Sequence, residues 1–139
     1  MNPKITVITL GVNDLDKAFA FYQNGLGFPS KDGIQFDGDL RIAFFQLKGT
    51  WLSLFERRLL AKDANVKMDG KGFPGFSLGH IVDTRSEVDE IMALAVRAGA
   101  TVSDPPHDRA WGGYSGYIKD LDGYYWEIAF MENPLPVEK

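Results

Sequence analysis

An acidic side chain in an otherwise apolar stretch is the strongest chemical feature of this sequence. Glu127 lies between Trp126 and Ile128, in a strand-like run that follows an Asp-x-Asp-Gly turn at residues 120–123. Aspartate and glycine favour such turns because they tolerate positive φ or hydrogen-bond to their own backbone. A carboxylate is costly to bury without a partner. Glu127 is therefore either a polar group at a cavity, able to serve as a ligand or a general base, or a buried acid satisfied within the core.

The other groups that could do chemistry are few. The chain has two histidines and no cysteine, which excludes disulfides, thiolate metal sites and cysteine nucleophiles. His80 lies three residues after Ser77 in a predicted strand, so alternation should point it to the opposite face, and His107 is predicted at the surface. No serine has the elbow or the His–Asp partners of a nucleophile, and no glycine-rich stretch has a phosphate-loop pattern.

The stretch from Trp111 to Tyr114 is a second candidate, because two glycines separate its aromatic residues. Glycine lets a backbone approach a ligand closely, and Trp111 supplies a face on which a ring can stack. The alternative is a glycine bulge at the start of a strand, with Trp111 plugging the core. The sequence favours neither interpretation.

Two similar halves must position these groups. In the first half, the pattern of apolar residues predicts a strand at residues 5–12, a helix at 14–25 and three strands at 34–36, 40–46 and 51–55. The second half repeats this order at residues 76–82, 84–99, 101–102, 114–119 and 125–130, with a loop over residues 105–113. Asp14 and the capping box of Thr84 and Glu87 predict where the helices begin, and two glycines predict where they end.

The numbering of the two halves indicates a duplication. The offset between matching residues is 70 at Val12 and Val82, and 74 at Gly25 and Gly99. The difference of four is about one helical turn, so the second helix is one turn longer. At the offset of 74, Ser53 lies opposite Glu127. We predict one domain over residues 1–139, with module one at 5–56, a Gly- and Pro-rich linker at 57–75 containing a helical turn at 59–63, and module two at 76–131.

Composition narrows the classes of partner. The net charge is −4 and there is no basic block, so we expect no nucleic-acid partner. No apolar run approaches membrane length and the N-terminus has no signal-peptide pattern, so we expect a cytoplasmic protein without a membrane partner. Ten Phe, five Tyr and three Trp favour a large core or an aromatic-lined pocket.

Several motifs, in this order, resemble those of the vicinal-oxygen-chelate superfamily, which includes glyoxalase I, bleomycin-resistance proteins and extradiol dioxygenases. They are Val12-Asn13-Asp14-Leu15, Phe21-Tyr22 with Leu26-Gly27-Phe28, and Asp120-Leu121-Asp122-Gly123 with Glu127. The resemblance implies an α+β protein of two tandem βαβββ modules, whose curled sheets surround a cavity. It also implies a homodimer, the commonest closed oligomer. One fold hosts many chemistries, so the resemblance names no reaction.

In metal-dependent members of that superfamily, the ligands lie on the first and last strands of each module. The resemblance places the corresponding positions at Val7, Ser53, Ser77 and Glu127. A catalytic divalent metal usually needs about three protein ligands, whereas valine cannot coordinate and serine is a poor neutral ligand. We therefore expect no metal and no other cofactor. A divalent ion held weakly by Glu127 is the alternative left open.

Strand alternation predicts which side chains share the cavity face. They are Val7, Thr9 and Gly11; Trp51, Ser53 and Phe55; Ser77, Gly79 and Ile81; and Tyr125, Glu127 and Ala129. If Ile118 pairs with Tyr125 across the turn, then Tyr114, Gly116 and Ile118 join this face. The ligand-binding residues predicted from the face and the loop are Trp51, Ser53, Ser77, Trp111, Tyr114, Tyr125 and Glu127. Such an aromatic cup suits a planar or amphipathic small molecule.

Three functions are open at this point. The first is a metal-free protein that binds a small aromatic or amphipathic ligand, as bleomycin-resistance proteins do, and the missing metal ligands favour it. The second is an enzyme of the glyoxalase superfamily, a lyase, isomerase or dioxygenase with Glu127 as its catalytic general base. The third is a structural or regulatory relative without a ligand, which a cavity filled by Trp51, Phe55 and Tyr125 would favour.

Overall fold

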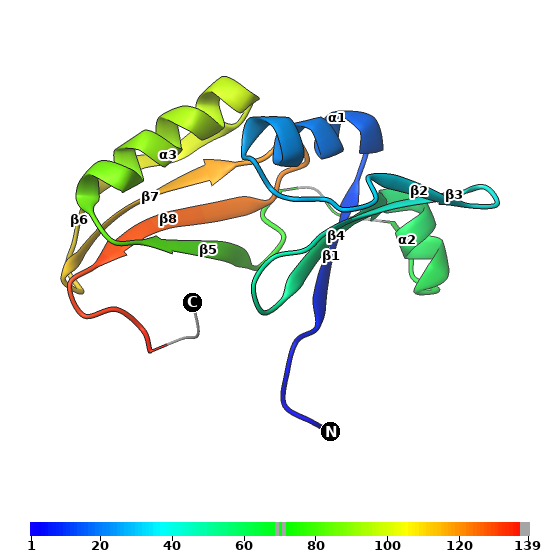
Figure 1. Ribbon diagram of the computed structural model, residues 1–139, viewed down its shortest axis with the longest axis horizontal. Coiled ribbons are helices and arrows are strands. Elements are labelled where there is room, and N and C mark those ends of the chain that lie inside the picture. Colours follow the sequence, from blue (N-terminus) through cyan, green and yellow to red (C-terminus); the bar gives the residue numbers. More distant parts are fainter. Residues whose placement is uncertain (69, 71, 137–139) are drawn as a thin grey trace. The chain divides into compact units, whose positions relative to one another are not determined.

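The computed structural model describes residues 1–68, 70 and 72–136, and the chain divides into two compact units with their boundary at Gly70. Figure 1 follows the elements of both units along the chain. The first unit contains β1 (Val7–Val12), α1 (Leu15–Ala20), a π-helical turn η1 (Phe21–Gly25), β2 (Ile34–Asp37), β3 (Leu40–Phe45), β4 (Trp51–Glu56) and α2 (Arg57–Asp63). The second contains β5 (Ser77–Val82), α3 (Arg85–Ala98), β6 (Thr101–Arg109), β7 (Gly113–Lys119) and β8 (Tyr125–Met131).

The first unit is a four-stranded sheet in the order β1-β4-β3-β2, with β1 parallel to β4 and the other neighbours antiparallel. Helix α1 begins as expected at Asp14, whose carboxylate accepts the amide of Lys17 at 3.0 Å. The helix buries Leu15 and Ala18, and the ring of Phe19 stacks on Phe45 with centroids 5.5 Å apart. The core of this unit therefore lies between α1 and one face of the sheet.

Helix α2 lies against the other face of this first sheet. A Cβ at Gly11 of β1 would lie 3.1 Å from the α-carbon of Arg57 and 3.3 Å from a methyl group of Leu60. Glycine permits this close approach because it carries no side chain. The expected helical turn at residues 59–63 thus belongs to a helix that begins at Arg57 and packs on module one.

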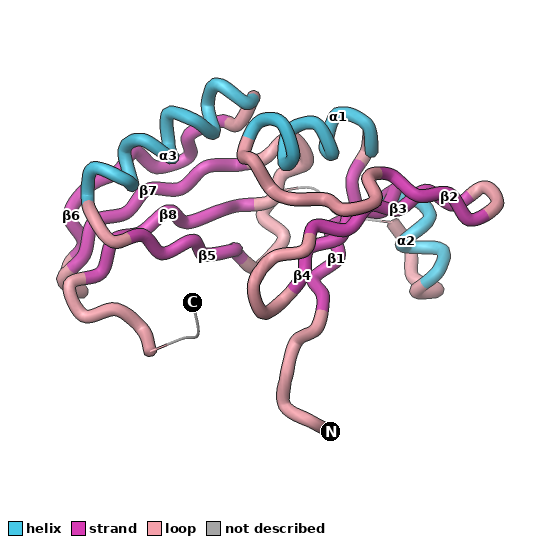
Figure 2. The backbone as a smooth tube through the Cα atoms, viewed as in Figure 1, coloured by secondary structure: helices cyan, strands magenta, loops and turns pink. Residues whose placement is uncertain are grey.

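The second unit repeats this arrangement with the sheet order β5-β8-β7-β6, in which β5 is parallel to β8. Helix α3 lies along one face of the sheet (Figures 1 and 2) and buries Val88, Met92 and Ala95. The capping box forms, because the hydroxyl of Thr84 accepts the amide of Glu87 at 3.1 Å. The helix ends at Gly99, whose φ of 118° is the left-handed conformation that favours glycine.

The predicted α+β class with two tandem βαβββ modules is confirmed, and each of the two sheets is open rather than closed. The predicted loop at residues 105–113 is wrong for most of its length, because β6 runs from Thr101 to Arg109. Pro105 and Pro106 are tolerated there since β6 is the edge strand and two shifts of register interrupt its pairing with β7. No helix within the described residues is long and apolar enough to span a membrane.

Candidate functional site

The face of the second sheet that points away from α3 carries Glu127. Gly116 lies on the α3 face, because a Cβ there would lie 2.9 Å from the methyl group of Met92. Side chains one residue to either side point the opposite way. We call this opposite side the Glu127 face, and its three rows of paired residues are Ser77, Tyr125 and Lys119; Gly79, Glu127 and Tyr117; and Ile81, Ala129 and Ser115.

Two hydroxyl groups of β7 hold the Glu127 carboxylate. The Ser115 hydroxyl is fully buried and donates to Oε2 of Glu127 at 2.8 Å. The Tyr117 phenol, directly opposite Glu127 in the sheet, also donates to the carboxylate. Burial raises the pKa of Tyr117, and the negative charge of Glu127 and the hydrogen bond to it raise that pKa further. Tyr117 thus remains a neutral donor, and the carboxylate is fixed in position on its β7 side.

Behind Ser115, a chain of polar side chains from β6 keeps the serine hydroxyl oriented. Arg109 donates from Nε to the Ser115 hydroxyl at 2.8 Å and from Nη2 to the Ser115 carbonyl at 3.1 Å. The same guanidinium forms an ion pair with Asp104 at 2.8 Å, and Nε2 of His107 lies 3.0 Å from the same carboxylate oxygen. Hydrogen bonds from His107 and then Arg109 lower the pKa of the Asp104 carboxyl. Because Ser115 accepts from Arg109, its proton is directed to Glu127.

The side of Glu127 toward β5 is open. Its partner across the parallel pair is Gly79, and a Cβ built there would meet no atom within 4 Å. In the first module the corresponding pair is Thr9 and Ser53, whose hydroxyl groups share a hydrogen bond of 2.5 Å, and Ser53 is fully buried. The same strand position is therefore closed by an internal hydrogen bond in module one, whereas in module two a carboxylate borders free space.

Aromatic rings border the open position. The ring of Phe73, in the segment before β5, meets Tyr125 edge-on with centroids 5.6 Å apart, and Phe73 is 67% exposed. Tyr117 lies on the far side of Glu127, and its ring has the Arg109 guanidinium 5.6 Å from its centroid. A ligand above Gly79 would meet a fixed carboxylate on one side and aromatic surface within one row of the sheet.

The predicted pairing of Ile118 with Tyr125 is wrong by one residue. Lys119 pairs with Tyr125, and Ile118 pairs with Trp126. The side chains of β7 that reach the Glu127 face are therefore Ser115, Tyr117 and Lys119, in place of the expected Tyr114, Gly116 and Ile118. Tyr114 lies on the α3 face instead, where its hydroxyl donates to Asp89 of that helix at 2.6 Å.

The other predicted site residues lie in two different environments. Ser77 is exposed and pairs with Tyr125 at the end of the Glu127 face. Trp111 lies in the turn between β6 and β7, and its ring packs directly on Gly113, leaving no room for a Cβ there. In the first module, Trp51 is 42% exposed and meets Phe44 edge-on at 6.3 Å. Trp51 and Ser53 belong to the first unit, and the remaining predicted residues belong to the second.

Arg109 could not be predicted as a site residue, because its stretch was expected to be a loop and its place on β6 depends on the full extent of that strand. Alternation places Ser115 and Tyr117 on one face of a predicted strand, but only the pairing of β7 with β8 decides that this face meets Glu127.

The four positions implied by the superfamily do not fit a resident divalent metal. Val7 offers only hydrocarbon, and the Ser53 hydroxyl is buried in its hydrogen bond with Thr9. Ser77 adds a neutral hydroxyl and Glu127 a single carboxylate, which is fewer strong ligands than such an ion needs. Across the described part of the chain, no group of three His, Cys, Asp or Glu side chains could hold a metal ion.

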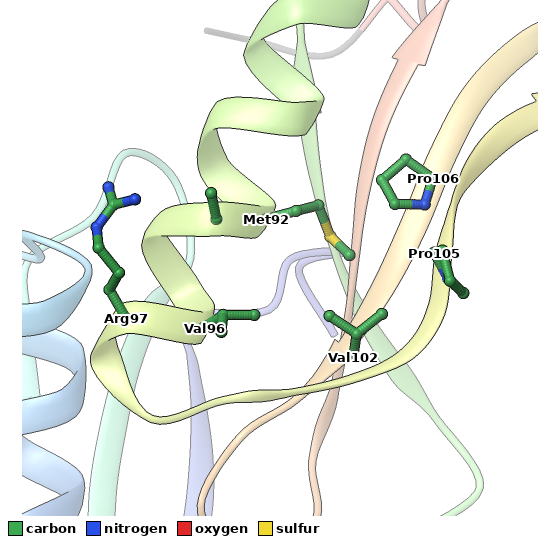
Figure 3. Close-up of a pocket in the computed structure, with 7 residues that line it drawn as sticks. Met92, Val96, Arg97, Val102, Pro105 and Pro106 are labelled. Carbon is green, nitrogen blue, oxygen red and sulfur yellow. The ribbon is translucent and has the colours of Figure 1, made fainter.

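The α3 face has a hollow of its own, a groove of about 580 Å³ between α3 and β6 (Figure 3). Met92, Val96, Val102, Pro105 and Pro106 line it with hydrocarbon. Arg97 is the only charged residue at its border, and Figure 3 shows that side chain pointing away from the other labelled residues. None of the residues that line this groove is an acid, a histidine or a nucleophile.

Comparisons with known proteins agree with this fold. The Glyoxalase/Bleomycin resistance protein/Dioxygenase superfamily matches residues 4–128. A glyoxalase-related enzyme from Fulvimarina pelagi is similar in structure, with a TM-score of 0.83 and 33% identity over 98% of this chain and 93% of that chain. A lactoylglutathione lyase from Agrobacterium tumefaciens has a TM-score of 0.66 and 28% identity, covering 94% and 95%. The Bacillus subtilis (strain 168) protein YraH is 26% identical over 132 residues, which are 92% of this chain and 98% of YraH.

Proposed function

Because the chain belongs to the glyoxalase/bleomycin resistance protein/dioxygenase superfamily, we propose that it binds a small aromatic or amphipathic molecule on the Glu127 face of module two. The ligand would lie above Gly79 and hydrogen-bond to the free side of the Glu127 carboxylate. It would do so without the resident divalent ion of metal-dependent relatives. One observation carries the proposal: a carboxylate fixed by Ser115 and Tyr117 borders a strand glycine with no atom within 4 Å of its Cβ position.

The contrast between the modules supports this choice of face. A partly buried carboxylate without a partner is unfavourable in a strand. The first module has Ser53 at this position, and its hydroxyl is hydrogen-bonded to that of Thr9. The second module keeps the acid, orients it with two hydroxyl groups, and leaves a glycine beside it. Such an arrangement suits a position that an outside molecule completes.

The test uses the natural contrast between the modules. Gly79→Thr gives module two the threonine that module one carries at the same position, and its hydroxyl can take the free side of Glu127. Native mass spectrometry of the purified protein, with and without a library of small aromatic compounds, should detect bound ligand in the natural protein. The variant should lose at least roughly tenfold in affinity, the scale of one well-made buried contact. Equal binding by both proteins would remove the ligand from this face.

A second function, an enzyme with Glu127 as general base, is favoured by the fixed carboxylate. A base must lie within hydrogen-bond reach of the proton it removes, and a substrate above Gly79 would present its proton to a carboxylate that Ser115 and Tyr117 already position. A lactoylglutathione-lyase assay with metal-free buffer tests this candidate. Under it, Glu127→Gln should abolish turnover while ligand binding persists, whereas a binding protein shows no turnover before or after the substitution.

The proposed active form is a homodimer, as closed two-fold assemblies are the commonest oligomers. Sedimentation velocity at several concentrations tests this: a single species of twice the 15.5 kDa chain mass is expected, and a monomer throughout would contradict it.

A further inference from the structure

We infer that the ligand of the Glu127 face is a small organic cation, an ammonium group carried on an aromatic or alkyl skeleton. This inference rests on the proposed function and adds the charge of the ligand to it. It depends on the neutral hydrogen-bond donors of Glu127, on the absence of an ion pair to it among the described residues, and on the surface next to it.

Glu127 has neutral hydrogen-bond donors and no cationic partner among the residues that the structure describes. Its hydrogen-bond donors are the hydroxyl groups of Ser115 and Tyr117. Within residues 1–68, 70 and 72–136, no nitrogen of a lysine, arginine or histidine lies within the 4.0 Å of an ion pair with it. A half-buried carboxylate whose charge has no direct counter-ion attracts a positive group more strongly than an exposed one does, because water screens it less.

Among the described residues, neither Arg109 nor Lys119 forms an ion pair with Glu127. The Ser115 hydroxyl lies between Arg109 and Glu127 and accepts from the arginine. The Arg109 guanidinium forms its ion pair with Asp104, at 2.8 Å. Lys119 lies one row further along the same face, opposite Tyr125. The arginine therefore orients the serine that orients the acid, while the carboxylate charge stays available on the side of Gly79.

The surface around the free side also favours a cation with a hydrocarbon part. Gly79 leaves space for an ammonium group to reach the carboxylate, and a charged donor makes hydrogen bonds roughly twice as strong as a neutral one. The rings of Tyr125 and Phe73 meet one row away, where they can pack on an apolar substituent or face the positive charge. An anion placed above Gly79 would instead meet the negative charge of Glu127.

Three probes of the same size and skeleton separate charge from shape: benzylammonium, benzyl alcohol and benzoate. Each is titrated into the full-length protein at neutral pH, in low salt and with a chelator present, so that no divalent ion is the cation. Amide chemical shifts of Gly79 and Glu127 report the place and the affinity of binding. We expect benzylammonium to bind at least roughly tenfold more tightly than benzyl alcohol, and benzoate to bind more weakly than either.

Matched variants identify the group responsible. Glu127→Gln keeps the shape and an acceptor for Ser115 but removes the charge, so the preference for benzylammonium over benzyl alcohol should fall to about twofold or less. Glu132→Gln removes an exposed carboxylate of the same module, 3.8 Å from Arg85 and outside the Glu127 face, and should leave the preference unchanged. Raising the salt concentration should weaken the binding of benzylammonium and leave the binding of benzyl alcohol unchanged.

The outcomes distinguish the inference from the function on which it rests. Equal affinities for all three probes, with shifts at Gly79 and Glu127, would overturn the cation inference and leave the binding face in place. Tighter binding of benzoate, with Lys119 as its partner, would overturn the inference in the same way. Absence of shifts at both amides for every probe and for the aromatic library would remove the proposed function as well.

Discussion

Two glycines on opposite faces of the second sheet should respond in opposite ways to a side chain, and this difference tests the geometry of the Glu127 face. Gly79 of β5 has no atom within 4 Å of its Cβ position, and its module-one counterpart is Thr9. Glycine in a strand costs roughly 0.5–1 kcal/mol relative to alanine, and β-branched residues are favoured there. A threonine hydroxyl can also donate to Glu127, as a neutral donor to a charged acceptor. Gly79→Thr should therefore stabilise the protein by about 1 kcal/mol.

Gly116 of β7 is the matched control, because it lies on the opposite face of the same sheet. A Cβ there would lie 2.9 Å from the methyl group of Met92, 2.9 Å from the backbone nitrogen of Pro106 and 3.0 Å from the carbonyl oxygen of Asp104. Two of these three neighbours are backbone atoms, which cannot move aside without disturbing the strand pairing. Overpacking of this kind costs about 1–3 kcal/mol, so Gly116→Ala should destabilise the protein by that amount.

Thermal unfolding followed by circular dichroism measures both effects. For a chain of this length, 1 kcal/mol corresponds to a change in Tm of about 4 °C, so Gly79→Thr should melt about 4 °C higher and Gly116→Ala about 4 °C lower or more. A lower Tm for Gly79→Thr would show that the space beside Glu127 is filled, and would refute the geometric reason for placing a ligand there. A neutral Gly116→Ala would refute the assignment of the two faces of the sheet.

Three further predictions concern the core, the titration of the site and its metal content. Met92→Asp should lower the free energy of unfolding by about 3 kcal/mol or more, since it places a charge in the core between α3 and the sheet; unchanged thermal stability would contradict that packing. Tyr117 has a pKa raised above its ordinary 10.0, so the folded protein holds this proton more tightly than the unfolded chain does. The stability that this shift contributes is therefore complete below the ordinary pKa of 10.0 and is lost as the pH rises through the raised pKa of the folded protein. In Glu127→Gln, tyrosinate absorbance corrected with Tyr117→Phe should show this residue titrating at a lower pH than in the natural protein, and an unchanged titration would place the phenol elsewhere. Emission spectrometry of dialysed protein should find well under one Zn, Ni, Mn or Fe per chain, and chelator should leave the Tm unchanged; near-unit metal content that Glu127→Ala removes would contradict the ligand count.

The sequence by itself determined the order of the elements and the acid of the candidate site. Hydrophobic periodicity, the Asp14 cap, the capping box at Thr84 and the stop at Gly99 are local signals, so they could be recognised from neighbouring residues alone. The change of offset from 70 to 74 likewise matched Ser53 with Glu127, and the parallel pairs of Thr9 with Ser53 and of Gly79 with Glu127 have that register.

The partners of Glu127 were decided only by the tertiary structure, because they depend on how β7 pairs with β8. Alternation says which residues of one strand share a face, but a shift of one residue in the pairing exchanges the two faces. The turn fixes that pairing. The carboxylate of Asp120 accepts the amides of Asp122 and Tyr124 at 2.9 and 2.8 Å, and the backbone amide of Asp120 donates to the carbonyl of Tyr124 at 2.8 Å. These bonds close the turn between Asp120 and Tyr124, so that Lys119 lies opposite Tyr125. Ser115 and Tyr117 thereby reach Glu127, and Tyr114 turns to α3, an outcome that no spacing along the chain specifies.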